Sequence, residues 1–250
     1  MSDILIERDN GVLEIRFNRP AKKNAITNAM YGAMADALES AAADPGIRAI
    51  LFAAEGDFFT AGNDLVDFAA QSSGAFEGPR HVGRFLQRMI EVEKPVVAAV
   101  QGNAVGVGVT MLLHCDLVYI AETAKLTTPF IDLGLVPENA SSLTLVDRIG
   151  HARAFAMLGL GEPLLGRDAA AFGIANASLP SSEVEPRARA AALALAKKPA
   201  ESLRLTKNLM RNRERLVARM QEEGALFAER LKSPEAAAAF AAFLGRPKSG

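Results

Sequence analysis

Short apolar runs that alternate with helical patterns constrain this chain more than any other feature. The runs IRAILFA (47–53), PVVAAVQ (95–101) and LVYIA (117–121) are almost continuously apolar. The segment HVGRFLQRMIEVE (81–93) instead places Phe85, Met89 and Ile90 at helical spacing. Parallel strands that are buried on both faces have such runs, and each needs a crossover connection to reach the next. The pattern therefore predicts an α/β fold with a parallel sheet.

The two ends of the chain differ from this central region. Asn10-Gly11 separates two alternating segments and predicts a two-residue hairpin turn. Thr27 is placed to cap a helix, and we expect 56–65 (GDFFTAGNDL) to be a loop that leads into another helix. From about Ser182 the pattern is helical throughout. Ser233-Pro234 begins a last helix whose apolar residues need something to pack against.

The charge and the single cysteine limit the classes of partner. The 250 residues include 28 Lys and Arg and 29 Asp and Glu, so the net charge is −1. No global field draws such a chain to nucleic acid or to an anionic membrane, and no apolar run approaches a membrane span of ~18 residues. Cys115 cannot form an internal disulfide, and MSDILIERDNG is unlike a secretory signal. We expect a cytoplasmic protein with no nucleic-acid or membrane partner.

Two segments place small residues where a strand gives way to a helix, namely 56–65 and QGNAVGVGVTMLLHCD (101–116). The first N–H groups of a helix lack an internal partner, and two that face one point can hold an oxygen that gains negative charge. Either segment alone is equally explained by a tight turn. The segment from Gly106 also fails as a dinucleotide fingerprint, because position 111 is Met. His81, His114 and His151 are scattered and suggest no metal site.

The order and spacing of four segments resemble the crotonase superfamily, also called enoyl-CoA hydratase/isomerase. They are NRPAKKNAIT, FFTAGNDL, KPVVAAVQGNAVGVGVTMLLHCD and the region of TTPFIDLGLVP. The resemblance implies a right-handed spiral of ββα repeats followed by a helical region used in trimer formation, with trimers often paired into hexamers. On this basis we expect residues 1–195 to form an acyl-CoA-binding core and residues 196–250 to form the helical oligomerisation region.

The resemblance also implies which groups act on an acyl-CoA thioester. The backbone N–H groups of Asn63 and Val107 would hold the thioester oxygen. Hydratases of the superfamily carry glutamates at two positions that are Thr110 and Phe130 here, so the water-adding pair is missing. Glu138 lies where several isomerases carry their acid, and its surroundings resemble the peroxisomal-type 3,2-enoyl-CoA isomerases.

One carboxylate suffices to move a double bond. It removes a proton from C2 of a 3-enoyl-CoA and returns it at C4, and no water is added. We expect apolar neighbours to raise the pKa of Glu138. The alternative is that Glu138, after Pro137, is only a helix-start acid. Asp132 is the rival carboxylate, and its position suggests a structural or interfacial ion pair.

The leading hypothesis is thus an isomerase that moves a 3-enoyl-CoA double bond to C2. The alternatives are an enoyl-CoA hydratase or other crotonase-type reaction, and a weakly catalytic acyl-CoA-binding protein. No metal and no cofactor is expected, since coenzyme A is part of the substrate. The resemblance assigns substrate or CoA contacts to Lys22, Lys23, Ala25, Ala61, Gly62, Asp64, Leu65, Gly106, Thr110 and Phe130.

Some of these residues have simpler explanations. Lys22 and Lys23 are equally explained as solvated surface lysines, and Asp64 as the cap of the helix that follows. Arg246 or Lys248 of a neighbouring subunit is a further candidate for contact with CoA. The segment 68–84 is expected to line the acyl tunnel.

Overall fold

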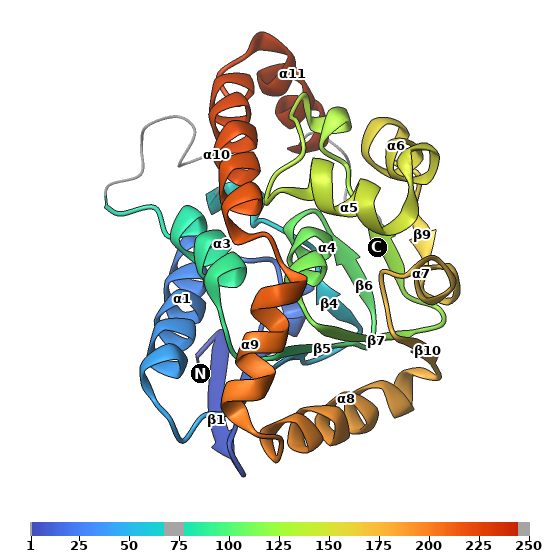
Figure 1. The fold of residues 1–250 in the computed structure, drawn as a ribbon. Coiled ribbons are helices and arrows are strands. Elements are labelled where there is room, and N and C mark those ends of the chain that lie inside the picture. The colour runs from blue at the N-terminus through green and yellow to red at the C-terminus, as the bar shows by residue number, and fades with distance from the viewer. Residues whose placement is uncertain (1, 68–77, 245–250) are drawn as a thin grey trace.

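The computed structural model describes residues 2–67 and 78–244, whose strands form two sheets (Figure 1). The first sheet has the order β1-β2-β3-β5-β7-β10 and the second has the order β4-β6-β8-β9. The strands of the first are β1 (Ile4–Asp9), β2 (Val12–Phe17), β3 (Ala49–Ala54), β5 (Val96–Val100), β7 (Leu117–Ala121) and β10 (Ala177–Leu179). Those of the second are β4 (Phe58–Thr60), β6 (Asn103–Val105), β8 (Lys125–Thr127) and β9 (Leu164–Leu165).

The chain passes between the sheets in a repeated way. It runs from β3 to β4, from β5 to β6 and from β7 to β8, so each passage contributes one strand to each sheet before helices follow. This arrangement confirms the spiral of ββα repeats. The expectation of a plain loop over 56–65 is wrong, because 58–60 forms β4. A strand of this length shows no periodicity in sequence, and its partner β6 lies far along the chain.

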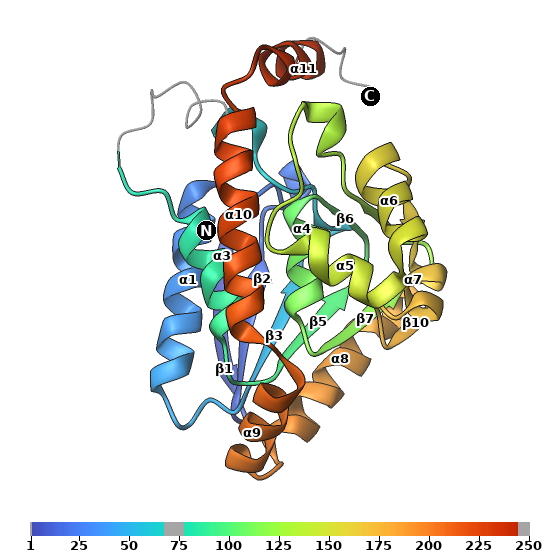
Figure 2. The same ribbon diagram turned by 45° about the horizontal axis from the view of Figure 1, so that its top comes forward.

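Helices surround the sheets. Helix α8 lies across β3, β5 and β7, and α11 lies over the end of the molecule beside 131–133 (Figure 2). The helices are α1 (Asn28–Ala43), α3 (Val82–Glu91), α4 (Val107–Thr110), α5 (Ser141–Ile149), α6 (His151–Leu160), α7 (Gly166–Phe172), α8 (Ser181–Ala196), α9 (Ala200–Met210), α10 (Arg213–Arg230) and α11 (Pro234–Leu244). Short 3-10 helices are η1 (Pro20–Lys22), η2 (Met111–His114) and η3 (Ile131–Leu133).

Local signals explain several of these boundaries. Asn10 and Gly11 have φ values of 49° and 80°, as the predicted hairpin turn between antiparallel β1 and β2 requires. Thr27 accepts a hydrogen bond from the N–H of Met30 at 3.3 Å and caps α1. Ser233 accepts one from the N–H of Ala236 at 3.2 Å at the start of α11. These three predictions are confirmed.

The core lies between and beneath the sheets. Strands β3 and β5 are buried at every residue and pair in parallel, which confirms the prediction from their apolar runs. The rings of Phe17 on β2 and Phe59 on β4 meet edge to face, with centroids 5.3 Å apart. Because these strands belong to different sheets, the contact joins the two sheets just before the loop that follows β4.

The C-terminal part is helical, as the sequence predicts. Phe240 of α11 packs against the core, so this apolar side chain is covered by the body of the same chain. The division of the chain at 195/196 falls at the end of α8 and stays a prediction. No helix within 2–67 and 78–244 combines the length and apolar character needed to cross a bilayer.

Candidate active site

Two loops of small residues meet at one edge of the second sheet. Strands β4 and β6 are parallel neighbours, so the loops that follow Thr60 and Val105 leave the sheet at the same end. Gly62 and Gly106 have φ values of +83° and +55°, a region in which residues with a side chain are strained. The backbone turns sharply at both points, and this turns the following N–H groups away from the sheet.

These loops are in tight contact. A Cβ atom on Gly62 would lie 2.8 Å from the carbonyl oxygen of Val105, and one on Gly108 would lie 2.4 Å from the methyl group of Thr60. Both distances are shorter than van der Waals contact. Close packing therefore favours glycine at both positions, and at Gly62 the positive φ favours it as well, so the explanation by tight turns alone is incomplete.

The directions of the two predicted donors follow from the neighbouring hydrogen bonds. The N–H of Ile26 donates to Gly62 O at 2.8 Å, and the N–H of Asp64 donates to Ile26 O at 2.9 Å. The N–H of Asn63, between them, thus points away from residue 26. Val107 is the first residue of α4, where an N–H has no acceptor within the helix. Both residues line one cavity of about 500 Å³.

The cavity brings together both predicted donors and half of the ten predicted contact residues. Its lining includes Ala61, Gly62, Asn63, Leu65, Gly106, Val107 and Phe130. The C-terminal helices close it with Phe227 of α10 and with Ala239 and Ala242 of α11. The segment 68–84, which is expected to line the acyl tunnel, lies outside the described residues over 68–77. Arg246 and Lys248 also lie outside the described residues.

Glu138 is buried three residues beyond Leu135, which lines this cavity, and is itself not among the described residues that line it. Its side chain lies in the loop before α5 and is only 7% exposed. Thr110 Oγ1 donates to Glu138 Oε1 at 3.2 Å. Thr110 follows Val107 by one helical turn, so it links the acid to the helix that begins with the second donor. The carboxyl group is not turned outward into solvent.

Burial raises the pKa of Glu138 to about 7, against the opposing effect of the Thr110 hydrogen bond; the charge of Glu223 adds to the rise. The predicted effect of apolar surroundings is therefore confirmed. A carboxyl group with this pKa is divided between its two forms at neutral pH and can both accept and release a proton.

Tyr31 is a residue of this site that sequence reasoning missed. Its hydroxyl donates to Asn63 Oδ1 at 2.6 Å, so it fixes the side chain of the first donor residue. Burial raises the pKa of Tyr31, and the charges of Glu138 and Asp67 add to the rise, which places it within electrostatic reach of the acid. The available signal was a tyrosine in the buried face of α1, because a buried tyrosine hydroxyl needs a partner.

His114 supports the loop that carries the acid. Its Nε2 lies 2.7 Å from Asn139 O, and Arg211 donates to its Nδ1 at 3.1 Å. Burial lowers the pKa of His114 to about 3, and the positive charge of Arg211 contributes. The ring is thus neutral and donates through Nε2. This contact agrees with the structural role expected of a solitary histidine.

The segment from Lys22 to Ala25 lies beside the first donor loop. Lys23 O accepts from the N–H of Ala61 at 2.9 Å, and the amide of buried Asn24 donates to Phe58 O at 2.8 Å. The Lys23 ammonium lies 5.0 Å from the centre of the Phe58 ring. Lys22, Lys23 and Ala25 are not among the described residues of the cavity wall, so their contact with CoA stays a prediction.

The two aspartates near the cavity differ in role. Asp64 Oδ1 accepts from the N–H groups of Val66 and Asp67 at 3.1 and 3.3 Å, which confirms it as a helix cap. Arg19 holds its other oxygen at 2.6 Å. Asp132 is exposed and lines the cavity, and no ion pair joins it to another described residue. Its predicted ion pair therefore stays untested within one chain.

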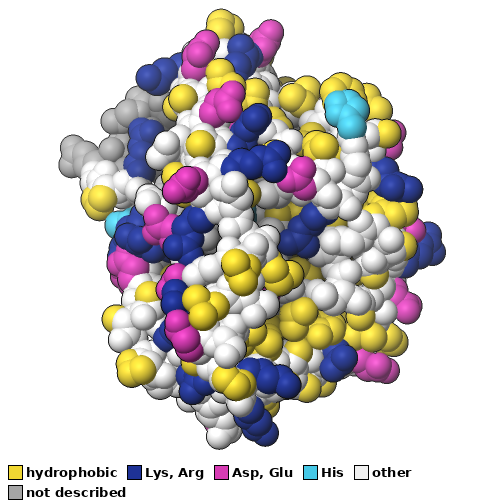
Figure 3. All heavy atoms as spheres, viewed as in Figure 1, with side chains coloured by type: hydrophobic (Ala, Val, Ile, Leu, Met, Phe, Trp, Pro, Cys, Tyr) yellow, Lys and Arg dark blue, Asp and Glu magenta, His cyan; other side chains and the backbone are white. Residues whose placement is uncertain are grey.

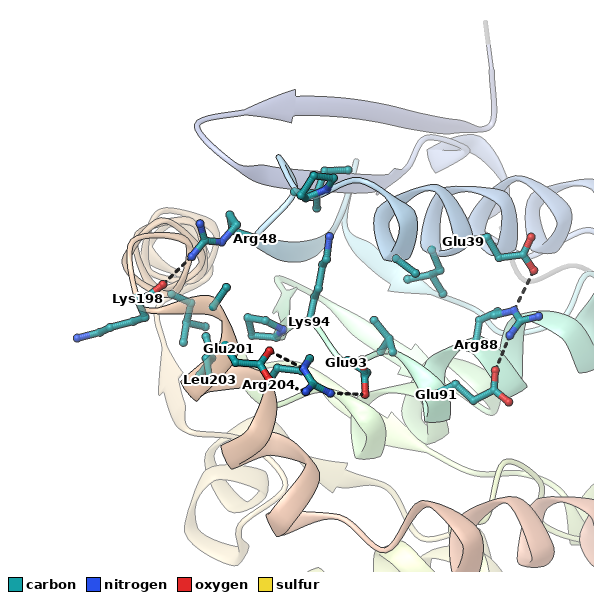
Figure 4. Close-up of a pocket in the computed structure, with 18 of the residues that line it drawn as sticks. Glu39, Arg48, Arg88, Glu91, Glu93, Lys94, Lys198, Glu201, Leu203 and Arg204 are labelled. Atoms are coloured by element: carbon teal, nitrogen blue, oxygen red, sulfur yellow. Dashed lines mark hydrogen bonds and ion pairs between the residues drawn. The ribbon is translucent and has the colours of Figure 1, made fainter.

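A second cavity of about 650 Å³ lies elsewhere, between α1, α3 and the start of α9 (Figure 4). Its charged side chains pair with one another: Arg204 with Glu93 and Glu201, and Arg88 with Glu39 and Glu91. None of its described lining residues belongs to the two glycine loops, and none of its described acids is buried. We therefore place the chemistry at the cavity beside the two glycine loops.

Comparisons with known proteins agree with this geometry. The family model described as enoyl-CoA hydratase/isomerase matches residues 7–249. The structure of OdaA from Pseudomonas aeruginosa is 44% identical, with a TM-score of 0.93 over 98% of this chain and 100% of that one. An enoyl-CoA hydratase/isomerase from Pseudoalteromonas atlantica T6c is 40% identical, also with a TM-score of 0.93, over 100% of both chains.

Enoyl-CoA delta isomerase 2 of Rattus norvegicus is 37% identical over 249 residues, which are 97% of this chain and 63% of that protein. The chain thus spans less than two thirds of this curated relative. The 2,3-dehydroadipyl-CoA hydratase of Escherichia coli strain K12 is 30% identical over 91% of this chain and 89% of its own. The fold and these matches define the class: the chain belongs to the enoyl-CoA hydratase/isomerase family.

Proposed function

We propose that this protein is an isomerase of acyl-CoA thioesters that moves the double bond of a 3-enoyl-CoA to C2. The observation that supports this most is Glu138, a buried acid with a pKa of about 7 whose partner Thr110 lies on the helix that begins with the second donor. Thr110 and Phe130 stand where a hydratase of the family carries its glutamates. The similarity to enoyl-CoA delta isomerases of rat, human and mouse supports the same reaction.

In the proposed mechanism, ionised Glu138 removes a proton from C2 of the substrate. The electron pair spreads from the thioester oxygen to C4, and the N–H groups of Asn63 and Val107 stabilise the oxygen. Glu138 then returns the proton at C4, which leaves the conjugated 2-enoyl thioester. Losing one such donor typically raises a barrier by ~2.7–4 kcal/mol. The reaction needs no cofactor besides the CoA of the substrate.

The first test replaces the acid by its neutral isostere. Glu138→Gln should lower kcat for 3-enoyl-CoA by at least ~10²-fold, because general acid–base catalysis contributes ~10²–10⁴-fold. The conjugated product is followed by its ultraviolet absorbance. Glu162→Gln, at an exposed position after α6, is the matched control and should retain full activity. A folded Glu138→Gln variant with undiminished turnover would falsify the assignment.

An enoyl-CoA hydratase or other crotonase-type reaction is the second candidate, favoured by the similarity to the E. coli hydratase. Incubation with 2-enoyl-CoA separates the two. The isomerase proposal predicts negligible water addition to 2-enoyl-CoA and rapid conjugation of 3-enoyl-CoA. The reverse result selects the hydratase. Binding of both thioesters without turnover selects an acyl-CoA-binding protein.

We further propose a homotrimer or a dimer of trimers. Figure 3 shows hydrophobic side chains on the face that includes α9, where Leu205, Leu209 and Met210 are 47%, 89% and 80% exposed. Such a surface favours contact with another chain. Light scattering of the pure protein tests this, and a monomer would contradict it. A cytoplasmic location is proposed from the lone thiol, Cys115, which is buried.

A further inference from the structure

The turn that carries Glu138 is strained. Asn139 and Ala140, immediately after it, have φ values of 61° and 56°. Two consecutive left-handed residues with side chains are uncommon, and such backbone conformations are unfavourable. A turn of this kind persists only where its surroundings hold it. The direction of the Glu138 side chain therefore depends on those contacts.

One contact on this turn comes from α10, far along the chain. The side chain of Ala140, the residue before α5, offers no cap to that helix. Glu223 Oε1 instead accepts from the N–H of Ser142 at 2.9 Å, the second residue of α5. The N–H of Ser141 donates to Glu138 O at 3.0 Å, so the capped turn includes the acid itself. Glu223 thus acts as a cap supplied by another helix.

Capping alone does not account for a buried carboxylate at this position. Glu223 is only 5% exposed, and its Oε2 has no hydrogen-bond partner among the described residues. A half-satisfied buried acid is unfavourable, whereas a neutral amide would also accept from the N–H of Ser142. Phe227, one helical turn further on α10, lines the candidate cavity. The same face of α10 therefore reaches both the cavity and the turn that follows the acid.

The charged and titratable groups around the acid are few. Within the described residues, Tyr31 of α1 and Glu223 of α10 interact with Glu138, and α4 contributes the neutral hydroxyl of Thr110. Arg219, on the same helix, acts on Glu223. Burial raises the pKa of Glu223 as well, against its hydrogen bonds to α5. Glu223 is thus the negative charge that acts on Glu138.

We propose that Glu223 is a positioning residue for the reaction: from α10 it fixes the strained turn that carries Glu138, and it presents a second carboxylate beside that acid. The inference rests on the proposed role of Glu138 as the base. Glu223 acts through Glu138 and touches no substrate. The helical C-terminal region therefore contributes directly to the reactivity of the site.

The test compares Glu223→Gln, which keeps an acceptor for Ser142, with Glu223→Ala, which does not. In Glu223→Gln the like charge is gone, so the acid limb of kcat/KM should move to lower pH by half a unit or more. In Glu223→Ala the turn is released, so kcat should fall tenfold or more while KM changes less than threefold. Glu229→Gln, at an exposed position further along α10, is the control and should match the unaltered enzyme.

A measurement that needs no turnover separates this inference from the proposed function. With ¹³C-labelled glutamate, the carboxyl signal that disappears in Glu138→Gln belongs to Glu138. Its titration midpoint should lie near 7 and should fall in Glu223→Gln. An unchanged midpoint in a folded Glu223→Gln variant, judged by circular dichroism, overturns the inference whatever the reaction is. If Glu138→Gln remains active, the proposed function fails instead, and the titration still decides the role of Glu223.

Discussion

At the scale of single residues, the site depends on one acid whose environment opposes its ionisation. Glu138 accepts a hydrogen bond from buried Thr110, and this bond compensates only part of the desolvation. Groups tuned for proton transfer often carry such a penalty. A functional carboxylate of this kind should therefore reduce the stability of the fold.

The stability penalty gives a pH-dependent prediction. The pKa of Glu138 in the folded state, about 7, lies above the ordinary glutamate value of 4.5. The contribution of this group to stability is complete below about pH 4.5 and is lost as the pH rises through about 7. At pH 8 the free energy of unfolding of Glu138→Gln should therefore be about 3 kcal/mol higher than that of the unaltered protein, since a difference of one in pKa corresponds to ~1.4 kcal/mol.

Urea denaturation at pH 4 and pH 8 measures this difference. The gain should be large at pH 8 and close to zero at pH 4. An equal effect at both pH values, or a loss of stability at pH 8, would show that ionisation of Glu138 does not destabilise the folded protein.

At the scale of elements, the two donor loops depend on each other. Strands β4 and β6 bring the loops to one edge, and the backbone of Val105 occupies the space where Gly62 would carry a side chain. Neither loop can move without the other. The distance between the two donor N–H groups is thus set by glycine packing.

Gly62→Ala should disturb this distance. Its φ of +83° and the 2.8 Å approach to Val105 O both oppose a Cβ atom, so the loop must shift. Misplacing a reacting group by about 1 Å can reduce the rate ~10²-fold, and we expect kcat/KM to fall at least tenfold. Gly83→Ala in α3 is the control, since a Cβ there meets nothing within 4 Å. Equal activity of the two variants would contradict the argument.

At the scale of the whole molecule, the C-terminal helices are tied to the spiral by polar contacts. Lys207 Nζ of α9 lies 2.7 Å from Asp116 Oδ2 and also donates to Lys94 O at 2.8 Å. Arg211 reaches His114, and Glu223 reaches Ser142. These contacts place α9 and α10 against the ends of strands and the loop of the acid. The helical region is therefore fixed on the core in a single chain.

Lys207→Met tests the strongest of these ties. The ammonium is 7% exposed, and removing it leaves Asp116 without its cation, although the N–H of Val96 still donates to it. Breaking a buried pair by losing one partner destabilises by ~3–5 kcal/mol, and partial exposure of Asp116 reduces our expectation to about 2 kcal/mol. Lys198→Met, at an exposed position, is the control in urea denaturation. Equal stabilities would mean that the tie contributes nothing.

Much of the fold was open to prediction because its signals are local. The hairpin at Asn10-Gly11 and the cap at Thr27 follow from backbone chemistry within a few residues, and buried parallel strands follow from their apolar runs. The short strands β4 and β6 gave no such signal, since pairing between distant segments creates them.

The sequence alone determined the hairpin, the long buried strands and their helices, the two glycine loops and the position of an acid after Pro137. Only the tertiary structure decided which groups surround that acid and how strongly it holds its proton. Thr110, Tyr31 and Glu223 come from α4, α1 and α10, and no spacing in the sequence predicts that they converge. Desolvation and charge–charge interaction depend on distances in space, so the proton affinity of Glu138 is a property of the packed chain.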